Sequence, residues 1–300
     1  MSGGFNVETR EGLESLVLHD TEGNGQLTLA PTRGGMATRL VLGGKDVFYL
    51  DEATLADVTK NVRGGNPVLF PQPGKLTGDT FANTESGKKG ALKQHGFARN
   101  LPWEVLRTST EGSASATLRL ASTATTRTAY PWDFVLEYTY KLTAGQLRIE
   151  QRFENTSADP MLFGAGFHPY FVVKQADKAS AKIGTRAARA FDNTRKKDIV
   201  LSGIDGIDGN NLSAKEVDLH LYDHGAVPCT LTWGAGAEAA KLSVRGSREF
   251  SRWVVWTLEG KDFVCVEPWT CGADALNTGD GLIVLAPSEA RTLWVEIARG

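Results

Sequence analysis

The chain has 300 residues, of which 41% are hydrophobic and 23% are charged, a composition that is ordinary for a soluble globular protein. Its formal net charge of -2 at pH 7 excludes the strongly basic balance by which proteins attract nucleic acids or anionic membranes.

The cysteines and the N-terminus bear on the compartment. Cys229, Cys265 and Cys271 are too few and too irregularly spaced for a disulfide framework or a zinc motif. Residues 1–12 lack the apolar run of a signal peptide. No stretch approaches the roughly 20 apolar residues of a membrane span. We therefore expect a cytoplasmic protein with no membrane and no nucleic acid as partner.

Alternation of apolar and polar residues recurs along the chain. In FVLEYTYKL (134–142) every second residue from Phe134 is apolar or aromatic, and LRIEQRF (147–153) continues this pattern after the turn TAGQ. Two such runs joined by a short turn with glycine predict a β-hairpin. The same pattern marks six further segments, 115–123, 241–246, 252–258, 263–269, 281–287 and 292–298.

Helical patterns are sparse. Residues 51–60 and 211–220 are candidates for one or two helical turns each, and the longest irregular regions are about 59–95 and 174–215. No repeat of 20 to 50 residues is present. Many strands separated by Gly, Asn, Asp and Pro predict an all-β protein, a large antiparallel β-sandwich in which residues 1–300 form a single domain.

Two ionisable residues, His168 and Glu267, each precede a proline inside an aromatic or β-branched strand, in AGFHPYF and VCVEPWT. Proline holds the preceding residue in an extended conformation. It also removes a donor from the sheet, so it is typical of edges, bulges and strand ends, where side chains are presented to a cleft. We therefore predict that both residues lie at the rim of a site.

Alternation predicts which neighbours share a face with these two residues. Cys265, Glu267 and Trp269 lie on one face of the second strand, and Gly166 leaves room beside His168 on the first. An indole beside a carboxylate is typical of sugar binding, because the ring stacks on C–H groups while the carboxylate accepts from a hydroxyl. Taken alone, each residue is also typical of a structural role: a hydrogen-bonded core histidine, an ion-paired glutamate and a core tryptophan.

A third group of candidates lies in loops. His95 and Arg99 belong to QHGFARN, where Gly96 permits unusual backbone angles beside the histidine. Arg63 precedes a double glycine in NVRGGNPVLFPQPG, and its planar guanidinium suits a sugar diol, a carboxylate or a phosphate. An ion pair that staples the loop is an equally good interpretation of Arg63.

The segments RGGNPVLFPQPG, QHGFARNLPW, AGFHPYF and VCVEPWT, in this order and at these distances, resemble the galactose mutarotase-like superfamily. Its members include aldose 1-epimerases and hexose-6-phosphate mutarotases. The resemblance runs from about residue 30 to the C-terminus, and HGFAR followed by HPYF and EPW is its most specific part. It implies a large antiparallel sandwich of the supersandwich type, with the sugar bound on a broad concave face.

Carried over residue by residue, the resemblance implies that Glu267 is the catalytic carboxylate and His168 the catalytic histidine. It implies that His95 contacts the ring oxygen of the sugar or an adjacent hydroxyl. Arg63 and Arg99 match arginines of the hexose-6-phosphate and related bacterial branches.

The family also uses an aspartate between the histidine and glutamate strands. Asp218 is the candidate that best resembles it, in competition with Asp205, Asp208 and Asp223. The segment FHPYF is nearer to aldose 1-epimerases, whereas RGG-x-P is nearer to the phosphosugar branch.

Interconversion of anomers requires that O1 of the sugar loses a proton while the ring oxygen gains one. Glu267 suits the base at O1, because a carboxylate is ionised at pH 7 unless it is strongly desolvated. His168 suits the acid at the ring oxygen, because the ordinary histidine pKa lies near the working pH. We expect the two groups on opposite sides of the reacting centre, and this chemistry requires neither a metal nor a redox cofactor.

The sequence therefore predicts a mutarotase whose partner is a sugar or a sugar phosphate. A hexose 6-phosphate is the alternative to a neutral aldose, because Arg63 and Arg99 together suit a phosphate. A non-catalytic carbohydrate-binding protein would keep Trp269 and the arginines without needing the pair of Glu267 and His168. A glycoside hydrolase or lyase ranks lower, because hydrolysis usually takes two carboxylates and one is found in a rim context.

Overall fold

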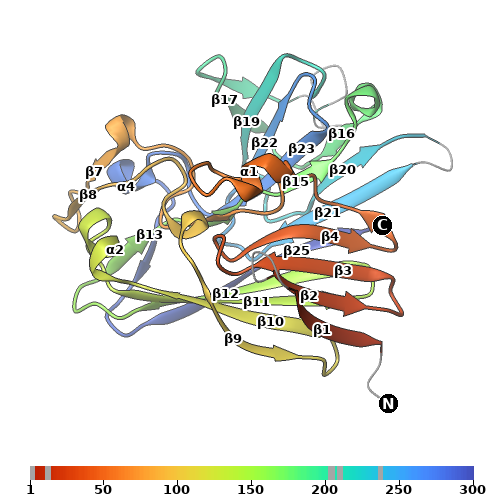
Figure 1. Cartoon of the computed structure of the whole chain (residues 1–300). Helices are drawn as coiled ribbons and strands as arrows, with labels where there is room; N and C mark the ends of the chain where they lie inside the picture. Colours follow the sequence, from red (N-terminus) through yellow and green to blue (C-terminus); the bar gives the residue numbers. More distant parts are fainter. Residues whose placement is uncertain (1–3, 11–14, 202–206, 208–211, 236–238) are drawn as a thin grey trace.

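The computed structural model describes residues 4–10, 15–201, 207, 212–235 and 239–300. Within these ranges the chain forms antiparallel sheets joined by loops, so the prediction of an all-β antiparallel sandwich is confirmed (Figure 1). The described helices are short: α1 (Glu52–Ala56), α2 (Ala124–Ala129), α4 (Ala275–Thr278) and the 3₁₀ turns Thr77–Asp79, Ala98–Asn100 and Gln175–Ser180. None of them is long and apolar enough to cross a membrane.

An N-terminal sheet of five strands packs against a longer sheet, here called the β12 sheet. The N-terminal sheet contains β1 (Phe5–Arg10), β2 (Ser15–Asp20), β3 (Gly25–Ala30), β4 (Met36–Leu42) and β5 (Lys45–Asp46). The β12 sheet has the order β16 (Lys182–Gly184), β20 (Cys229–Trp233), β21 (Ala240–Gly246), β25 (Ala290–Arg299), β12 (Gln146–Asn155), β11 (Phe134–Thr143), β10 (Ala114–Ala121) and β9 (Glu104–Ser109). Strands β2 and β3 contact β11, so the two sheets share one core.

A second eight-stranded sheet, here called the β23 sheet, has its strands β17, β19 and β22 at the top of Figure 1. Its order is β18 (Lys197–Val200), β17 (Arg189–Asp192), β19 (Glu216–Tyr222), β22 (Arg252–Leu258), β23 (Phe263–Trp269), β14 (Gly166–Phe167) and β6 (Val68–Leu69), with β15 (Tyr170–Val172) also paired to β23. Two small ribbons complete the described strands: β13 (Met161–Phe163) with β24 (Ile283–Leu285), and β7 (Thr80–Ala82) with β8 (Lys89–Ala91).

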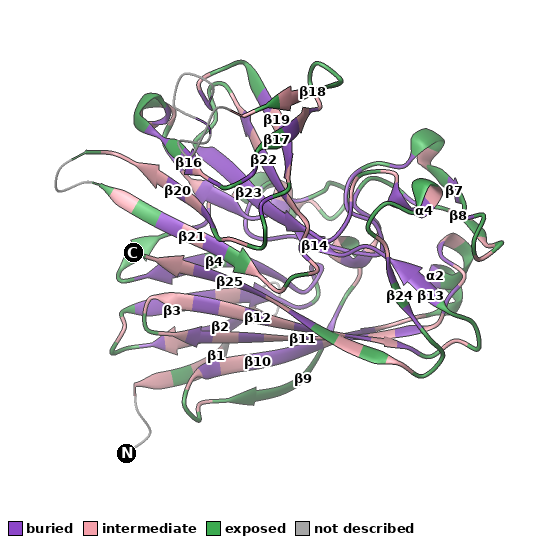
Figure 2. Cartoon of the chain, turned by 180° about the vertical axis from the view of Figure 1, so that it is seen from behind, coloured by how far each residue is buried: buried purple, intermediate pink, exposed green. Residues whose placement is uncertain are grey.

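The predicted hairpin of β11 and β12 is confirmed. Burial alternates at every residue of both strands, so the apolar set that begins at Phe134 faces the core and the polar set is partly exposed (Figure 2). Thr143 pairs with Gln146 across the two-residue turn, where Gly145 adopts a positive φ of 70°. Because the side chains of a strand alternate, this register fixes which face of each strand lies in the core.

Phe70 ties the predicted loop region to the core. Its ring is fully buried and lies 5.1–6.1 Å from five other aromatic rings, those of Phe97, Tyr130, Phe134, Phe153 and Phe163. Aromatic clusters of this kind contribute both buried area and favourable ring geometry. The segment after β6 is therefore held firmly enough to position the polar side chains that follow it.

One local prediction is right only in part. Within 211–220, which was expected to hold one or two helical turns, Leu212 is helical but residues 216–220 belong to strand β19. Val217 and Leu219 are buried on one side of the strand, and Asp218 and His220 lie on the other. Val217, Leu219 and Leu221 recur with a period of two rather than 3.6, which is the alternation of a strand.

The hydroxyl of Tyr140 links the β12 sheet to the N-terminal sheet. It is buried and donates a 2.7 Å hydrogen bond to the carbonyl oxygen of Gly35. We expect Tyr140→Phe to lower the free energy of unfolding by about 1–3 kcal/mol, because a buried acceptor loses its donor. Chemical denaturation checks this. Ser115→Ala, which removes a hydroxyl with a surface hydrogen bond of 3.5 Å, is the control and should change stability by under ~0.5 kcal/mol. Equal effects of the two changes would contradict the assignment.

Candidate active site

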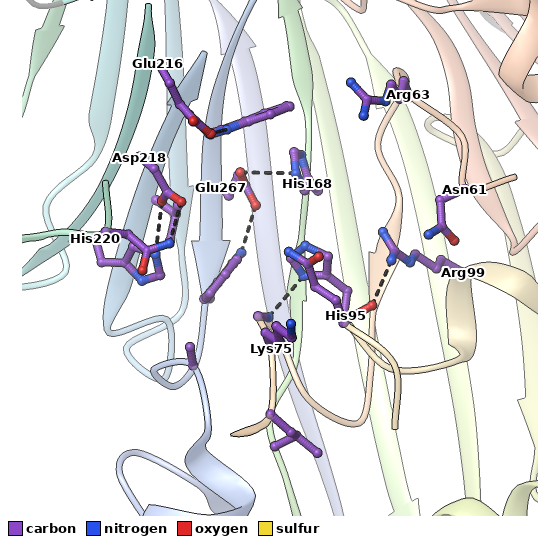
Figure 3. A pocket seen from close by; sticks show the side chains of 18 of the residues that line it. Asn61, Arg63, Lys75, His95, Arg99, His168, Glu216, Asp218, His220 and Glu267 are labelled. Atoms are coloured by element: carbon purple, nitrogen blue, oxygen red, sulfur yellow. Dashed lines mark hydrogen bonds and ion pairs between the residues drawn. The ribbon is translucent and has the colours of Figure 1, made fainter. Parts of the chain in front are cut away.

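A cavity of about 650 Å³ opens on one face of the β23 sheet (Figure 3). All seven residues singled out in the sequence line it: His95, His168, Glu267, Arg63, Arg99, Asp218 and Trp269. In Figure 3, Arg63 and Arg99 lie on one side, Asp218 on the opposite side, and His168 and Glu267 between them. The structure therefore brings together side chains that are up to about 200 positions apart in the chain.

The register of two strands places His168 beside Glu267. Gly166 pairs with Trp269 in β14 and β23, and Tyr170 pairs with Cys265 in β15 and β23. His168 lies midway between Gly166 and Tyr170, and Glu267 lies midway between their partners, so the two face each other across the strands. His168 Nε2 is 3.4 Å from Glu267 Oε1. They are direct neighbours, whereas the sequence led us to expect them on opposite sides of the reacting centre.

The residue after each of these two is a proline, which explains the gap in the sheet here. Pro169 and Pro268 have no backbone N–H, so the strands cannot complete their hydrogen-bond ladder at this point. The chain on the other side compensates, because the backbone N–H of His168 donates to the carbonyl oxygen of Pro67 at 3.1 Å. Gly166 leaves room for the neighbouring tryptophan, because a Cβ at this position would lie 3.0 Å from the indole of Trp269.

Trp269 orients the carboxyl group. Its Nε1 donates to Glu267 Oε2 at 3.1 Å, and its ring is 3% exposed. Oε1 is then the oxygen left to face His168. The indole therefore fixes the plane of the carboxyl group. The sequence had instead indicated that Trp269 stacks on a sugar ring.

Burial sets the protonation of the pair. It raises the pKa of Glu267 well above its ordinary value of 4.5, and the charge of Asp218 raises it further. Burial also lowers the pKa of His168 to about 3, helped by the guanidinium of Arg99. His168 Nδ1 has no hydrogen-bond partner among the described residues, which also disfavours a charged ring. The favoured form is a protonated carboxyl beside a neutral imidazole, with one proton between Oε1 and Nε2.

Asp218 has the opposite behaviour although it lies in the same cavity. Burial opposes its charge, but His220 Nε2 lies 3.2 Å from Oδ1 and Asn193 Nδ2 donates to Oδ2 at 2.6 Å. These contacts hold the pKa of Asp218 below its ordinary value. The cavity thus contains one carboxylate that stays ionised and one carboxyl that resists ionisation, an arrangement typical of acid–base sites.

His95 is held by the backbone in a single orientation. It has a positive φ of 69°, rare for a residue other than glycine, and its Nδ1 accepts a 3.0 Å hydrogen bond from the backbone N–H of Gly74. Nε2 therefore carries the proton of the neutral ring. Burial and the nearby His168 lower the pKa of His95 well below 6.5. His95 thus offers a neutral N–H donor to the cavity.

The two arginines differ in how they are held. Arg99 donates to the carbonyl oxygen of Gln94 at 2.7 Å, while its buried Nε has no hydrogen-bond partner among the described residues. Burial lowers the pKa of Arg99. Arg63 is exposed, and no ion pair or side-chain hydrogen bond of its guanidinium occurs within the described ranges. The stapling ion pair considered for Arg63 is therefore not formed with any described residue.

Sequence reasoning missed several lining residues. Lys75 and Lys196 add two cations, and Glu216 and His220 line the β19 side. Lys196 belongs to the turn between β17 and β18, where its ammonium donates to Asn193 Oδ1 at 2.6 Å. The alternation Glu216, Asp218, His220 would have revealed this face if the segment had been interpreted as a strand. The two lysines lie in loops that carry no recognisable signal.

The competing aspartates are separated by their positions. Asp223 forms an ion pair with Arg189 at 2.6 Å on the surface and does not line the cavity. Asp205 and Asp208 lie outside the described residues. Among the described candidates, Asp218 is the aspartate beside Glu267.

A family model described as aldose 1-epimerase matches residues 22–298 of the chain. The chain is 34% identical to the Slr1438 protein from Synechocystis sp. PCC 6803, whose crystal structure matches with a TM-score of 0.89 over 98% of both chains. A galactose mutarotase-like protein from Clostridium acetobutylicum has the same fold, with 16% identity and a TM-score of 0.82 over 99% of both chains.

A curated relative from Salmonella typhimurium is 29% identical over 169 residues and carries the name "Putative glucose-6-phosphate 1-epimerase". The match covers 54% of this chain and 50% of the relative, so the chain spans about half the length of that protein.

The backbone at Gly96 is the part of the His95 loop that tolerates least change. Gly96 has a φ of 70°, and a Cβ there would lie 2.1 Å from the carbonyl oxygen of Phe70. We expect Gly96→Ala to destabilise the fold by about 1–3 kcal/mol through overpacking, beyond the cost of the positive φ itself, and to displace His95. Denaturation and activity measurements check both effects.

Gly87→Ala is the matched control for this change. Gly87 has a φ of 68°, but a Cβ there meets nothing within 4 Å. The control therefore bears the backbone strain alone, about 1–2 kcal/mol. If Gly96→Ala is no more destabilising than Gly87→Ala, the close approach to Phe70 does not hold the loop.

Proposed function

This chain belongs to the aldose 1-epimerase family, and we propose that it is a mutarotase, which interconverts the α and β anomers of an aldose by opening and closing the ring. The reaction is an isomerisation, with a sugar as the partner. We propose that the chain acts as a single domain. A cytoplasmic location is supported by its three free, buried thiols, which suit a reducing compartment.

The contact between His168 and Glu267 carries the proposal. An acid and a base lie 3.4 Å apart at the floor of the cavity and share one proton. Burying such a pair lowers stability, and pairs of this kind are typical of catalytic sites. A protein that only binds carbohydrate has no use for this arrangement. The non-catalytic alternative is therefore disfavoured.

The close spacing suits this reaction. The hydroxyl oxygen O1 and the ring oxygen are both bonded to C1, so two neighbouring groups can exchange protons with both of them. We propose that Glu267 takes the proton from O1 while His168 gives a proton to the ring oxygen. The C1–ring oxygen bond then breaks to give the aldehyde, rotation about C1–C2 turns the carbonyl, and the reverse transfers close the ring.

The shared proton accounts for how the buried pair becomes active. In the free cavity the proton lies on Glu267 Oε1, because burial opposes separated charges. Its transfer to His168 Nε2 produces the carboxylate and the imidazolium that the reaction needs. Sugar hydroxyls and the fixed dipoles of the site then solvate the two charges in place of water. After one turnover the proton is back between the same two atoms.

The remaining residues position the sugar. The Nε2–H of His95 is a neutral donor suited to a ring oxygen or a hydroxyl, and the ionised Asp218 is an acceptor for hydroxyls on the opposite side. The hydrogen bond from Trp269 holds the carboxyl group of Glu267 in one orientation. Well-placed donors and acceptors of this kind hold the reacting bond in line with the acid and the base.

A hexose 6-phosphate is the second candidate substrate. Arg63, Lys75, Arg99 and Lys196 line the cavity against the carboxyl groups of Glu216, Asp218 and Glu267, one of which favours its neutral form. The exposed guanidinium of Arg63, which pairs with no carboxylate among the described residues, suits phosphate oxygens, and Arg99 lines the same side of the cavity. The name carried by the Salmonella typhimurium relative points the same way.

We expect Glu267→Gln to lower the rate of mutarotation by about 100- to 10,000-fold, because the amide cannot accept the O1 proton. His168→Asn should cause a loss of similar size. The measurement is the optical rotation of freshly dissolved α-glucose or α-galactose as it relaxes to equilibrium. A folded Glu267→Gln variant with near-normal turnover would contradict the assignment of Glu267 as the base.

Asp223→Asn is the control for the charge change, since this carboxylate is paired with Arg189 on the surface and away from the cavity. Its rate should match that of the unchanged protein. Circular dichroism and a melting curve on each variant separate loss of chemistry from loss of fold.

Arg63→Ala distinguishes the two substrates. If a phosphate is bound, the change should raise KM for glucose 6-phosphate by about 10- to 100-fold, the worth of a hydrogen bond to a charged group, and leave KM for glucose unchanged. Equal KM changes for both sugars would show that Arg63 holds the ring or its loop instead. A preference of the unchanged protein for glucose over glucose 6-phosphate would remove the second candidate.

A further inference from the structure

Cys265 is a buried nucleophilic group that the proposed reaction does not use. It precedes Glu267 by two residues in β23 and lies on the same face of the strand. Its partner in the sheet is Tyr170, the residue two positions after His168. The thiol is fully buried, does not line the cavity and packs with Tyr170 and Phe263.

The thiol completes a group of three metal-binding side chains. One ligand atom from each of His168, Cys265 and Glu267 lies within 4.8 Å of the others. Within the described ranges, this is the one group of at least three His, Cys, Asp or Glu residues that converges in this way. All three side chains are buried, and His168 also has a ring nitrogen with no partner among the described residues.

The spacing fits a tetrahedral zinc ion. Zinc bonds of about 2.0–2.3 Å to nitrogen, oxygen and sulfur place neighbouring ligand atoms roughly 3.3–3.7 Å apart. The 3.4 Å between His168 Nε2 and Glu267 Oε1 already has this value. The sulfur of Cys265 lies at most 4.8 Å from the other two ligand atoms, so a shift of about 1 Å, a χ1 rotation of roughly 30°, brings it to the distance that zinc requires.

We propose that His168, Cys265 and Glu267 form a binding site for Zn²⁺, and that zinc bound there blocks the acid–base pair. The binding does not depend on what reaction the protein catalyses. The inhibition rests on the proposed mutarotase function. A thiolate, an imidazole and a carboxylate together favour zinc over magnesium or calcium, which prefer oxygen ligands alone.

The binding step is a proton exchange without any redox change. Zn²⁺ forms bonds to the sulfur of Cys265, a ring nitrogen of His168 and a carboxylate oxygen of Glu267. It displaces the thiol proton of Cys265 and the proton shared by Glu267 and His168, and both go to solvent. The charge of the ion is then balanced by one thiolate and one carboxylate, which suits a buried site. Affinity should rise with pH because two protons are released.

Calorimetric titration of the full chain with Zn²⁺ tests the site directly. We expect one ion per chain, with proton release in buffers of different ionisation enthalpy. Cys265→Ser should weaken binding by about 10-fold or more, since even loss of an outer-shell partner costs that much. Cys229→Ser is the matched control, because Cys229 is also fully buried but lies on β20 of the other large sheet. It should bind zinc as the unchanged chain does.

Cadmium provides a readout that leaves Cys265 intact. In a chain with Cys229→Ser and Cys271→Ser, Cys265 is the remaining thiol, and Cd²⁺ should produce the ultraviolet absorption of a cadmium–thiolate bond. Absence of this absorption, or equal zinc affinity of the unchanged chain and Cys265→Ser, overturns the site. If the buried hydroxyl of Cys265→Ser destabilises the strand, Cys265→Ala replaces it as the variant that removes the thiol.

Inhibition separates this proposal from the proposed function. Zinc should stop mutarotation by the unchanged protein, and Cys265→Ser should need about 10-fold more zinc for the same effect while its rate without zinc stays normal. If zinc binding depends on Cys265 but the protein accelerates the mutarotation of no sugar, the mutarotase function is refuted and the zinc site stands. If the protein catalyses mutarotation but does not bind zinc, the zinc site is refuted and the function stands.

Discussion

The cross-strand contact between His168 and Glu267 is the interaction on which the rest of the site depends. It exists because β14, β15 and β23 keep one antiparallel register on both sides of two prolines, which open the ladder where the side chains meet. Gly166 lets Trp269 approach closely enough to hold one oxygen of the carboxyl group, so the other oxygen faces the imidazole. A shift of either strand by one residue would turn one member of the pair into the core and leave the other as an uncompensated polar group.

Around this pair the protein arranges groups whose charges oppose one another. Burial and the ionised Asp218 favour a protonated Glu267, whereas Arg99 and the hydrogen bond from Trp269 favour its carboxylate. Asp218 stays charged because His220 and Asn193 bind its two oxygens. The result is a proton that rests on Glu267 in the free cavity and lies 3.4 Å from His168, so one group can act as acid and its neighbour as base in either direction of a reversible reaction.

Much of the fold was predictable because most strands alternate without interruption, as β11 and β12 show. The candidate residues His95, His168 and Glu267 were recognisable from short motifs, but their distances were not, since contacts between residues about 100 positions apart depend on the whole sheet. Residues 216–220 were misassigned because their short alternation follows a segment that begins as a helix, and His220 was missed with them. Lys75 and Lys196 belong to loops, where a side chain's direction follows from tertiary packing alone. Nothing in the spacing of Cys265 and Glu267 indicated that a histidine from another strand would complete a metal-binding group.

The most direct test of the account is the protonation of Glu267 itself. An NMR titration of its carboxyl carbon, assigned by comparison with Glu267→Gln, reports the ionisation without any substrate. The account predicts a pKa well above the ordinary 4.5, falling when Asp218 is replaced by asparagine, while the ring of His168 stays neutral down to about pH 3. A Glu267 carboxyl that titrates at its ordinary value, beside a His168 that becomes charged near pH 6.5, would contradict the shared proton and the mechanism built on it.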